Sequence, residues 1–244
     1  MSTTPRPSLA AIVLGAALVL SALVLALGFA RVRPDAHYVS VKGVAEREVR
    51  ADLAIWPLVL SAADDDLARA QGKLEQSVAA IRAFLVRQQV DTSQLSLQSF
   101  VVTDAFANQY GGTGEVRTRY VIRQTVVVRS TDPARVLAAS QRVGELVNAG
   151  VVLSSGGEYG AGGPTFVFTG LNALKPPMIA EATARAREAA EQFARDARQS
   201  LGGIRRASQG VFEILPRDQA PGITEGSQLV KTVRVVSTIE YELR

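Results

Sequence analysis

Four acidic residues occupy positions where two carboxylates could in principle work together as acid and base. They are Asp52, Glu158, Asp196 and Asp218. A hydrolase needs two such groups beside one substrate, one to donate a proton and one to accept it. Nothing in the spacing of the four selects a pair, and the solvated surface is the usual place of an acidic side chain. We therefore predict no catalytic residue, and a hydrolase is the weakest of the functional hypotheses.

Metal-binding side chains are also scarce. The chain has no cysteine and a single histidine, His37, so disulfides, thiolate catalysis and zinc–thiolate sites are excluded. The run Asp64–Asp66 precedes a helical pattern, where neighbouring residues point in different directions and cannot all converge on one ion. We interpret the run as the N-cap and the dipole partner of that helix. The sequence predicts no metal and no cofactor.

The composition is typical of a folded protein rather than a disordered one. Of the 244 residues, 47% are hydrophobic and 20% are charged, and the formal net charge is +4. Acids and bases are interspersed along cationic stretches such as residues 185–198, so no run is positive enough to follow a phosphate backbone. The sequence therefore predicts no nucleic-acid partner.

An apolar segment near the N-terminus has the length of a membrane span. Leu9–Phe29 contains 21 residues, none of them charged, and would form a helix about 31 Å long. We interpret it as an uncleaved transmembrane anchor; the rival is a cleavable signal peptide, for which Ala26–Gly28 offers a small-x-small pattern. Arg6 on one side is matched by Arg31 and Arg33 on the other, so charge bias leaves the orientation open.

After a short tail at residues 1–8, the anchor at 9–29 and a linker at 30–37, one domain is expected over residues 38–244, and two tightly joined lobes would also fit. Strands are predicted, in chain order, over Tyr38–Val44, Val49–Ser61, Leu95–Asp104, Val116–Ser130, Val151–Leu153, Thr165–Phe168, Val211–Leu215 and Val230–Leu243. The charged stretch Glu46–Glu48 separates the first two. In Val116–Ser130 one face is largely apolar, whereas the other carries four arginines.

Three helices are predicted between these strands. The first follows the aspartate run over residues 67–85, and the second covers Pro133–Asn148 and is closed by Gly150. The third is opened by Pro176-Pro177 and ended by Leu201–Gly203. It carries a stripe of small and apolar residues, namely Ile179, Ala182, Ala186, Ala189, Phe193, Ala197 and Leu201. This order predicts an α+β fold in which a mostly antiparallel or mixed sheet packs with about three helices, preceded by one N-terminal transmembrane helix.

The strand around Trp56 is the candidate contact between subunits. Pro57 is tolerated chiefly at a sheet edge or a bulge, and both faces of this strand are apolar. An exposed apolar edge is an aggregation hazard that a closed ring of subunits would cover. A strand buried on both sides within its own monomer explains the pattern equally well. The predicted interface consists of Trp56, Pro57, Leu58 and Leu60, with Arg217 and Asp218 from a later loop.

Much of the chain resembles the SIMPL-domain family of exported bacterial envelope proteins. The resemblance rests on Val78–Leu97, Tyr120–Ser130, the helix after Asp132, Phe166–Leu171 and above all the Ala/Arg repeat and Leu-Gly of Ala184–Gly202. Two positions depart from the family: its Pro-Asp is Ala51-Asp52 here, and its usual glycine after the first helix is Gln89. The resemblance implies export, ring-like homo-oligomers and an association with envelope or oxidative stress. It carries no catalytic residues.

The leading hypothesis is therefore a non-enzymatic envelope protein, held in the inner membrane by Leu9–Phe29, with its C-terminal domain in the periplasm. Its expected partners are the lipid bilayer and further copies of the same chain. The alternative is a periplasmic binding module for a glycan, a lipid or a protein. Such a module would use two loops rich in aromatic residues and glycine, Phe106–Gly114 and Tyr159–Gly163.

Overall fold

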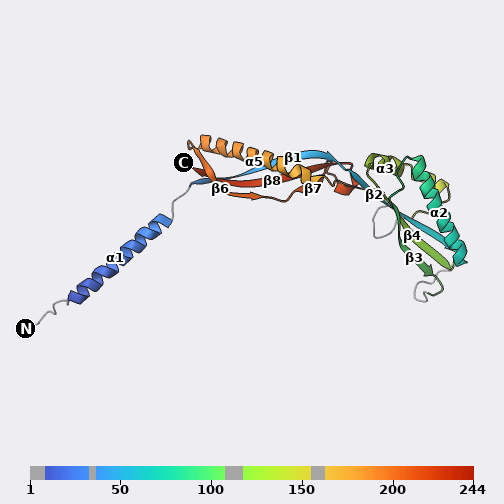
Figure 1. Ribbon diagram of the computed structural model, residues 1–244, viewed down its shortest axis with the longest axis horizontal. Helices are drawn as coiled ribbons and strands as arrows, with labels where there is room; N and C mark the ends of the chain where they lie inside the picture. The colour runs from blue at the N-terminus through green and yellow to red at the C-terminus, as the bar shows by residue number, and fades with distance from the viewer. Residues whose placement is uncertain (1–8, 33–36, 108–117, 155–162) are drawn as a thin grey trace, which may run out of the picture. The chain divides into compact units, whose positions relative to one another are not determined.

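The computed structural model describes residues 9–32, 37–107, 118–154 and 163–244 (Figure 1). These form an α+β fold with two antiparallel four-stranded sheets and five α-helices. The elements, in chain order, are α1 (Leu9–Val32), β1 (Tyr38–Arg50), β2 (Leu53–Asp64), α2 (Leu67–Arg87), β3 (Leu95–Asp104), β4 (Tyr120–Ser130), α3 (Pro133–Ser140), α4 (Gly144–Asn148), β5 (Thr165–Val167), α5 (Leu171–Asp196), β6 (Leu201–Gln209), β7 (Glu213–Pro216), the 3₁₀ helix η1 (Glu225–Ser227) and β8 (Val230–Leu243).

The chain divides into two compact units, and residues 38–244, for which one domain or two tightly joined lobes were expected, contribute to both. Unit 1 contains Met1–Gly43, Thr183–Gln209 and Ser237–Arg244, and unit 2 contains Val44–Ala182 and Gly210–Val236. Three elements, β1, α5 and β8, contain residues of both units. The two units are described separately below.

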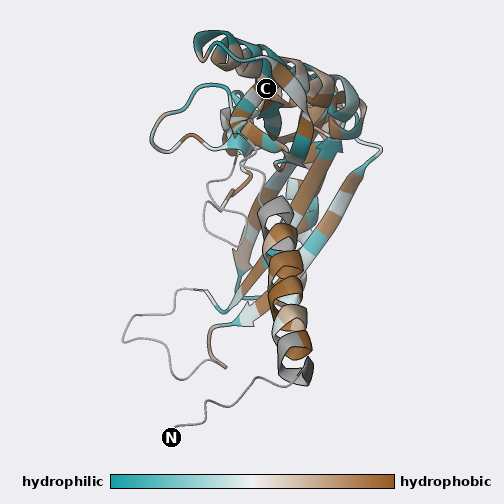
Figure 2. Cartoon of the chain, turned by 90° about the vertical axis from the view of Figure 1, so that its left-hand side faces the viewer, coloured by the Kyte–Doolittle hydropathy of each residue, from teal (hydrophilic) through white to brown (hydrophobic). Residues whose placement is uncertain are grey.

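Helix α1 contains the apolar segment singled out in the sequence. Its side chains are described for residues 13–27, which are mostly brown, and so hydrophobic, in Figure 2. The large apolar side chains among them are all more than half exposed. Within the described residues, no helix is both long and apolar enough to cross a membrane. The transmembrane helix expected over Leu9–Phe29 therefore stays a prediction.

The sheet of unit 2 has the strand order β3-β4-β2-β5, with β2 paired to β4 along its whole length. Strand β4 alternates as predicted, since Ile122, Val126 and Val128 are buried whereas Arg123 and Arg129 are exposed. Helix α2 packs against β2 and β4 on the apolar face. Its buried residues, with those of β2 and β4, form the largest hydrophobic core of the chain.

The ends of helix α2 follow from local sequence. Asp66 is the N-cap, and its Oδ1 accepts a hydrogen bond from the backbone N–H of Arg69 at 2.9 Å. At the other end Val90 N donates to Leu85 O and Gln89 N donates to Val86 O, the two bonds of a Schellman motif. Gln89 therefore has a φ of +57°, the conformation that a glycine would adopt without strain.

The helix predicted over Pro133–Asn148 is two helices, α3 and α4. Asp132 and Pro133 begin α3 as expected, and Gly150, with a φ of +82°, closes α4. Between them, the hydroxyl of Ser140 donates to Leu137 O at 2.8 Å, and α4 starts at Gly144. A serine that bonds back to the helix, followed by a glycine, lowers the helical preference at this point and explains the break.

Helix α5 starts five residues earlier than predicted, at Leu171, so Pro176 and Pro177 lie inside it. The two prolines deprive the carbonyls of Asn172 and Ala173 of their helical partners, but both of these residues are exposed and can bond to water. The predicted small-residue stripe is shifted by one position at several places. In unit 2, Met178 and Ala182 pack against β1 and β8; in unit 1, α5 packs on the sheet through Ala186 and Ala190. Phe193, expected in the stripe, is exposed.

The second sheet has the strand order β1-β8-β6, with β7 also paired to β8. The predicted break at Glu46–Glu48 is wrong, because β1 runs through it. Glu46 and Glu48 lie on the exposed face, where Glu46 pairs with Arg234, whereas Arg47 is half-buried on the other face and pairs with Glu181 of α5. Strand β6 was missed, since Gly202-Gly203 was interpreted only as a helix end. Its pairing with β8, from Leu201↔Leu243 to Gln209↔Ser237, makes this segment a strand.

Candidate functional site

The strand that was expected to form a subunit contact lies inside unit 2. Trp56, Leu58 and Leu60 are almost fully buried in its core, on the face opposite Ile55 and Val59. Strand β2 pairs with β4 on one side and with β5 on the other, so the premise of an edge strand is wrong. The alternative, a strand covered on both sides within its own monomer, describes β2.

Pro57 marks a gap between two short partners of β2 rather than the edge of a sheet. Val59 O accepts from Ser154 N at 2.8 Å, and Ser61 N donates to Val152 O at 3.1 Å. Because backbone groups alternate sides along a strand, the nitrogen of Pro57 faces this same side, between residues 152–154 and β5. No described acceptor lies opposite the nitrogen of Pro57, so the missing N–H costs no hydrogen bond and a proline is tolerated.

Arg217 and Asp218 lie in the exposed loop after β7. The Nη2 of Arg217 is 2.8 Å from Oδ2 of Asp218, and this bond holds the pKa of the Asp218 carboxyl below its usual range. Gln228 fixes the loop by accepting from Asp218 N and donating to Asp218 O, each at 3.1 Å. The loop is thus ordered by its own contacts, while the other four predicted interface residues belong to β2.

The carboxylates considered for catalysis are engaged in separate local bonds. Both oxygens of Asp52 accept from the backbone N–H of Thr169, and one accepts from its hydroxyl as well. Asp52 thereby holds the turn between β1 and β2, although the family's preceding proline is absent. Asp196 accepts from the amide of Gln192 at 3.0 Å, and Glu158 lies outside the described residues.

The three consecutive aspartates each bond to different groups. The carboxylate of Asp64 accepts bonds from Lys73 Nζ and Arg69 Nη2, each at 2.8 Å. These bonds hold the pKa of Asp64 well below its usual range, and the bond from Lys73 has the larger effect. Asp65 accepts from Arg119 N at 3.0 Å, and Asp66 is the N-cap. In the described part of the chain, no group of three or more histidine or acidic side chains could hold a metal ion.

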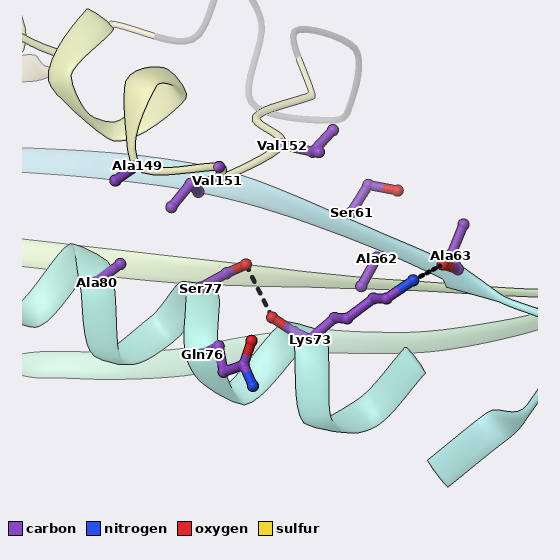
Figure 3. Close-up of a pocket in the computed structure, with 11 residues that line it drawn as sticks. Ser61, Ala62, Ala63, Lys73, Gln76, Ser77, Ala80, Ala149, Val151 and Val152 are labelled. Atoms are coloured by element: carbon purple, nitrogen blue, oxygen red, sulfur yellow. Dashed lines mark hydrogen bonds between the residues drawn. The ribbon is translucent and has the colours of Figure 1, made fainter. Parts of the chain in front are cut away.

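A cavity of about 350 Å³ lies in unit 2 beside these residues, between α2, β2 and residues 149–152 (Figure 3). Lys73 reaches across from α2, and its Nζ donates to Ala63 O at 3.2 Å besides pairing with Asp64. Ser77 donates to Lys73 O at 2.9 Å. The one cation of the lining is therefore already bound, and the remaining polar groups, those of Ser61 and Gln76, suit an uncharged ligand.

The exposed edge that the sequence analysis sought is β3. This strand pairs with β4 alone among the described strands, and its side chains are mostly exposed. We call Leu97, Phe100, Val101 and Val102 the β3 edge; each is between 43% and 51% exposed. Leu97 and Val102 pair with the buried Val126 and Ile122 and so face the core side, but helix α2 leaves them half uncovered.

A bulge interrupts the β3 edge. Between Gln98 and Val101 the register with β4 shifts by one residue, and Ser99 has a φ of +52°. A bulge of this kind increases the local twist and directs side chains outward. It also restricts which strands can pair beside β3, because a straight edge would accept any partner. The edge therefore combines apolar surface with a defined shape.

Arg119 fixes the end of the β3–β4 hairpin. Its guanidinium bonds to both carboxylate oxygens of Asp104, and it lies 4.8 Å from the ring centre of Tyr120 and 5.8 Å from that of Phe106. The bond from Arg119 lowers the pKa of Asp104. The loops at Phe106–Gly114 and Tyr159–Gly163 lie mostly outside the described residues, so the binding-module expectation for them is untested.

Sequence reasoning missed β3 as the edge strand although it predicted the bounds Leu95–Asp104 correctly. The signal was present: Phe100, Val101 and Val102 are three consecutive apolar residues, and a strand covered on one face would alternate. In β2 the same departure from alternation reflects burial on both faces. The pattern alone does not separate the two cases, because exposure depends on which strands lie alongside.

Comparison with known proteins identifies the sequence family. The model of the SIMPL family, described as a protein of unknown function (DUF541), matches residues 39–237. No curated protein matches the chain. Among solved structures, the regulatory subunit of aspartate kinase from Thermus flavus aligns over 82% of this chain and 89% of its own, with 15% identity and a TM-score of 0.17. So low a score carries no conclusion about fold or function.

Proposed function

The chain belongs to the SIMPL family, and from this premise we propose that it is a non-enzymatic envelope protein, anchored in the inner membrane by α1, whose subunits assemble into a closed homo-oligomer. The observation that carries the proposal is the β3 edge. It presents half-exposed apolar side chains and backbone groups that pair with no second described strand, all on one strand of unit 2. Such an edge associates with another strand unless it is covered. In a closed ring the edge of every subunit is covered by a neighbour, so no edge remains exposed.

Anchoring in the inner membrane is supported by the uncharged run Leu9–Phe29 and by the exposed apolar side chains of residues 13–27. Because the family resemblance implies export, we propose that the rest of the chain lies in the periplasm. Protease added to spheroplasts tests this orientation: the C-terminal domain should be digested. Complete protection of the C-terminal domain would show that the orientation is the opposite of the one proposed.

Assembly is tested by light scattering on the detergent-solubilised full chain. We expect a discrete oligomer at micromolar concentration, and we expect Val101→Asp to convert it into monomers. Val101 pairs with the exposed Arg123, so the new carboxylate gains a partner within its own sheet and the fold should survive. In an edge-to-edge contact the same charge would lose its water even with Arg123 beside it, and this desolvation opposes association.

Val152→Asp is the matched control, because Val152 is also an exposed valine of unit 2 and does not belong to β3. It should leave the oligomer intact. Circular dichroism of both variants shows that each is folded. A monomeric wild-type chain, or equal loss of assembly in the two variants, would contradict the role of the β3 edge.

The alternative function, a binding module, is favoured by the cavity beside Lys73. Its size, and its hydroxyl and amide groups that bond to no described residue, suit one or two sugar units. Thermal unfolding in the presence of mono- and disaccharides tests it: stabilisation that disappears in Ala62→Leu, which fills the cavity, would favour binding over assembly.

An association with envelope or oxidative stress belongs to the same proposal, since the family resemblance implies it. A deletion strain should then be more sensitive than its parent to peroxide or to envelope-active detergents. Rescue by the wild-type chain but not by Val101→Asp would connect this role to assembly.

A further inference from the structure

We propose that one end of unit 1 docks onto anionic phospholipid headgroups of the membrane in which α1 is held. This inference rests on the proposed anchoring of α1. The surface concerned, called here the arginine end, consists of Arg198, Arg205 and Arg206 with the neighbouring exposed side chains Tyr38, Phe193 and Ile204.

The length of the chain keeps this part of unit 1 near the membrane. Helix α1 ends at Val32 and β1 begins at Tyr38. The six residue steps between them span at most about 20 Å when fully extended. If α1 lies in the bilayer, Tyr38 is therefore within about two to three Debye lengths of the membrane end of α1 at physiological ionic strength.

Backbone hydrogen bonds gather several chain segments around Tyr38. Leu243 N donates to His37 O at 2.8 Å, which joins the end of β8 to the start of β1. Ser200 and Arg244 exchange two further backbone bonds, which join the turn between α5 and β6 to the C-terminus. The end of α5 and the beginning of β6 thus lie at the same end of unit 1 as the linker to α1.

Cations are in excess in this unit. Residues 30–43, 183–209 and 237–244 carry 10 Lys and Arg against 6 Asp and Glu, whereas unit 2 carries 16 against 17. Acids and bases alternate along residues 185–198 in sequence, but the three arginines of the arginine end are exposed and form no ion pair with any described residue. Their charge is available for an external anion.

The other side chains of this surface match the composition of a membrane interface. Arg205 lies over the ring of Tyr38 at 4.7 Å from its centre. Tyr38 is 51% exposed, Phe193 58% and Ile204 56%. Arginine beside exposed aromatic and aliphatic residues is typical of surfaces that rest in the headgroup region, where the charge meets phosphate and the ring meets the acyl boundary.

The backbone at Arg198 does not explain why an arginine is there. Gln199 N donates to Ala194 O and Arg198 N to Arg195 O, so α5 ends in a Schellman motif with Arg198 in the left-handed position. Its φ is +54°, a conformation that favours glycine. Arginine is thus present where the turn itself would be less strained without a side chain, and the side chain is unpaired among the described residues.

The test uses the full chain incorporated in lipid nanodiscs. Because the chain lacks cysteine, Ser208→Cys places a single fluorescent label on the exposed face of β6. Headgroup spin-labelled lipid then quenches the label according to its distance from the membrane surface. We expect strong quenching in discs containing phosphatidylglycerol, weak quenching in pure phosphatidylcholine, and loss of the difference at high salt.

Charge removal should act on docking and not on folding. Each cation near an anionic surface contributes about fivefold to the docking equilibrium, so Arg198→Gly, Arg205→Gln and Arg206→Gln together should weaken it about a hundredfold. Arg198→Gly alone should reduce quenching while raising the thermal midpoint of unit 1, which a purely structural residue would not do. Gln89→Gly makes the same backbone change in unit 2 and should leave quenching unchanged.

Quenching that is equal in the two lipids, or unchanged in the triple variant, would overturn the inference while leaving the anchor intact. A chain that fails to enter the discs at all would overturn the anchor as well. The two failures are distinguished by whether protein and disc elute together.

Discussion

Gln89 and Arg198 hold the same place in two different helix endings. Each is the left-handed residue of a Schellman motif, and Gly150 fills the equivalent position after α4. The family's usual glycine after the first helix is replaced here by Gln89 without loss of the turn. The backbone geometry is therefore set by the helix ending, and the residue type decides only how much strain it contains.

Gln89→Gly should stabilise unit 2 by about 1 kcal/mol, because an L-residue in the left-handed region costs that much or slightly more. The gain is reduced by the loss of a weak bond, since Arg135 lies 3.4 Å from the side-chain oxygen of Gln89. Urea unfolding followed by the fluorescence of the buried Trp56 measures the change. Gly150→Ala should shift stability in the opposite direction; equal effects of the two would refute the explanation.

Asp64 makes stability depend on pH in the acid range. Its carboxylate is bonded to Lys73 and Arg69, which lowers its pKa in the folded chain below the unfolded value near 3.9. The unfolded chain therefore binds a proton more readily, so the contribution of Asp64 is complete above about pH 5 and falls as the pH drops further. Asp64→Asn should destabilise the chain at pH 7 more than at pH 3.

Glu75→Gln is the control, because it removes a carboxylate of α2, the helix that carries Arg69 and Lys73, and this carboxylate forms no ion pair with the described residues. Chemical denaturation at both pH values gives the two differences. An effect of Asp64→Asn that is independent of pH would show that the carboxylate acts through its shape and not through its charge.

At the level of elements, the sequence correctly predicted the features that depend on residues close together in the chain. The caps Asp66 and Asp132, the closing Gly150 and the bounds of β3 and β8 were all predicted correctly. What was missed depends on distant partners. Strands β1 and β2 are consecutive and look like a hairpin, but β1 pairs with β8 and β2 with β4, which creates two sheets in place of one.

The candidate site shows the same limit. The residue types around Trp56 fitted both a subunit contact at a sheet edge and a strand buried on both sides within its own monomer, and they did not say which elements lie beside the strand. In the structure, β2 lies between β4 and β5 within the sheet, and α2 of the same chain packs on it. Strand β6 was missed because its glycines have low strand propensity, and its pairing with β8 outweighs that preference.

The 3₁₀ helix η1 is attached to β8 by a buried cation. Lys231 is fully buried, and its Nζ pairs with the carboxylate of Glu225 and donates to the carbonyl of the same residue. Removing the anion leaves a buried charge that lacks its counter-ion, which is more costly than replacing both groups by apolar ones. Glu225→Ala should therefore lower the free energy of unfolding by about 3 kcal/mol.

Lys231→Met added to Glu225→Ala should recover most of that loss, because no unpaired charge remains. Trp56 fluorescence in urea again gives both values. Additive destabilisation by the two substitutions would mean that the pair is not coupled and that the backbone bond alone retains η1.

For the whole molecule, the two proposed interactions belong to different units: unit 1 carries α1 and the arginine end, and unit 2 carries the β3 edge. Anchoring then affects assembly without touching the contact, because it confines the subunits to a plane and raises their effective concentration. A chain consisting of residues 37–244 keeps every element except α1. It should form the same oligomer, but only at a concentration about a hundredfold higher or more.

Sedimentation of the truncated chain over a dilution series, beside cross-linking of the full chain in vesicles at matched protein density, measures this shift. Val101→Asp should abolish assembly in both, since the β3 edge is common to them. If the truncated chain assembled as readily as the full one, confinement would contribute nothing. If Val101→Asp affected only the full chain, the contact would lie in or near α1, and the β3 edge would lose its proposed role.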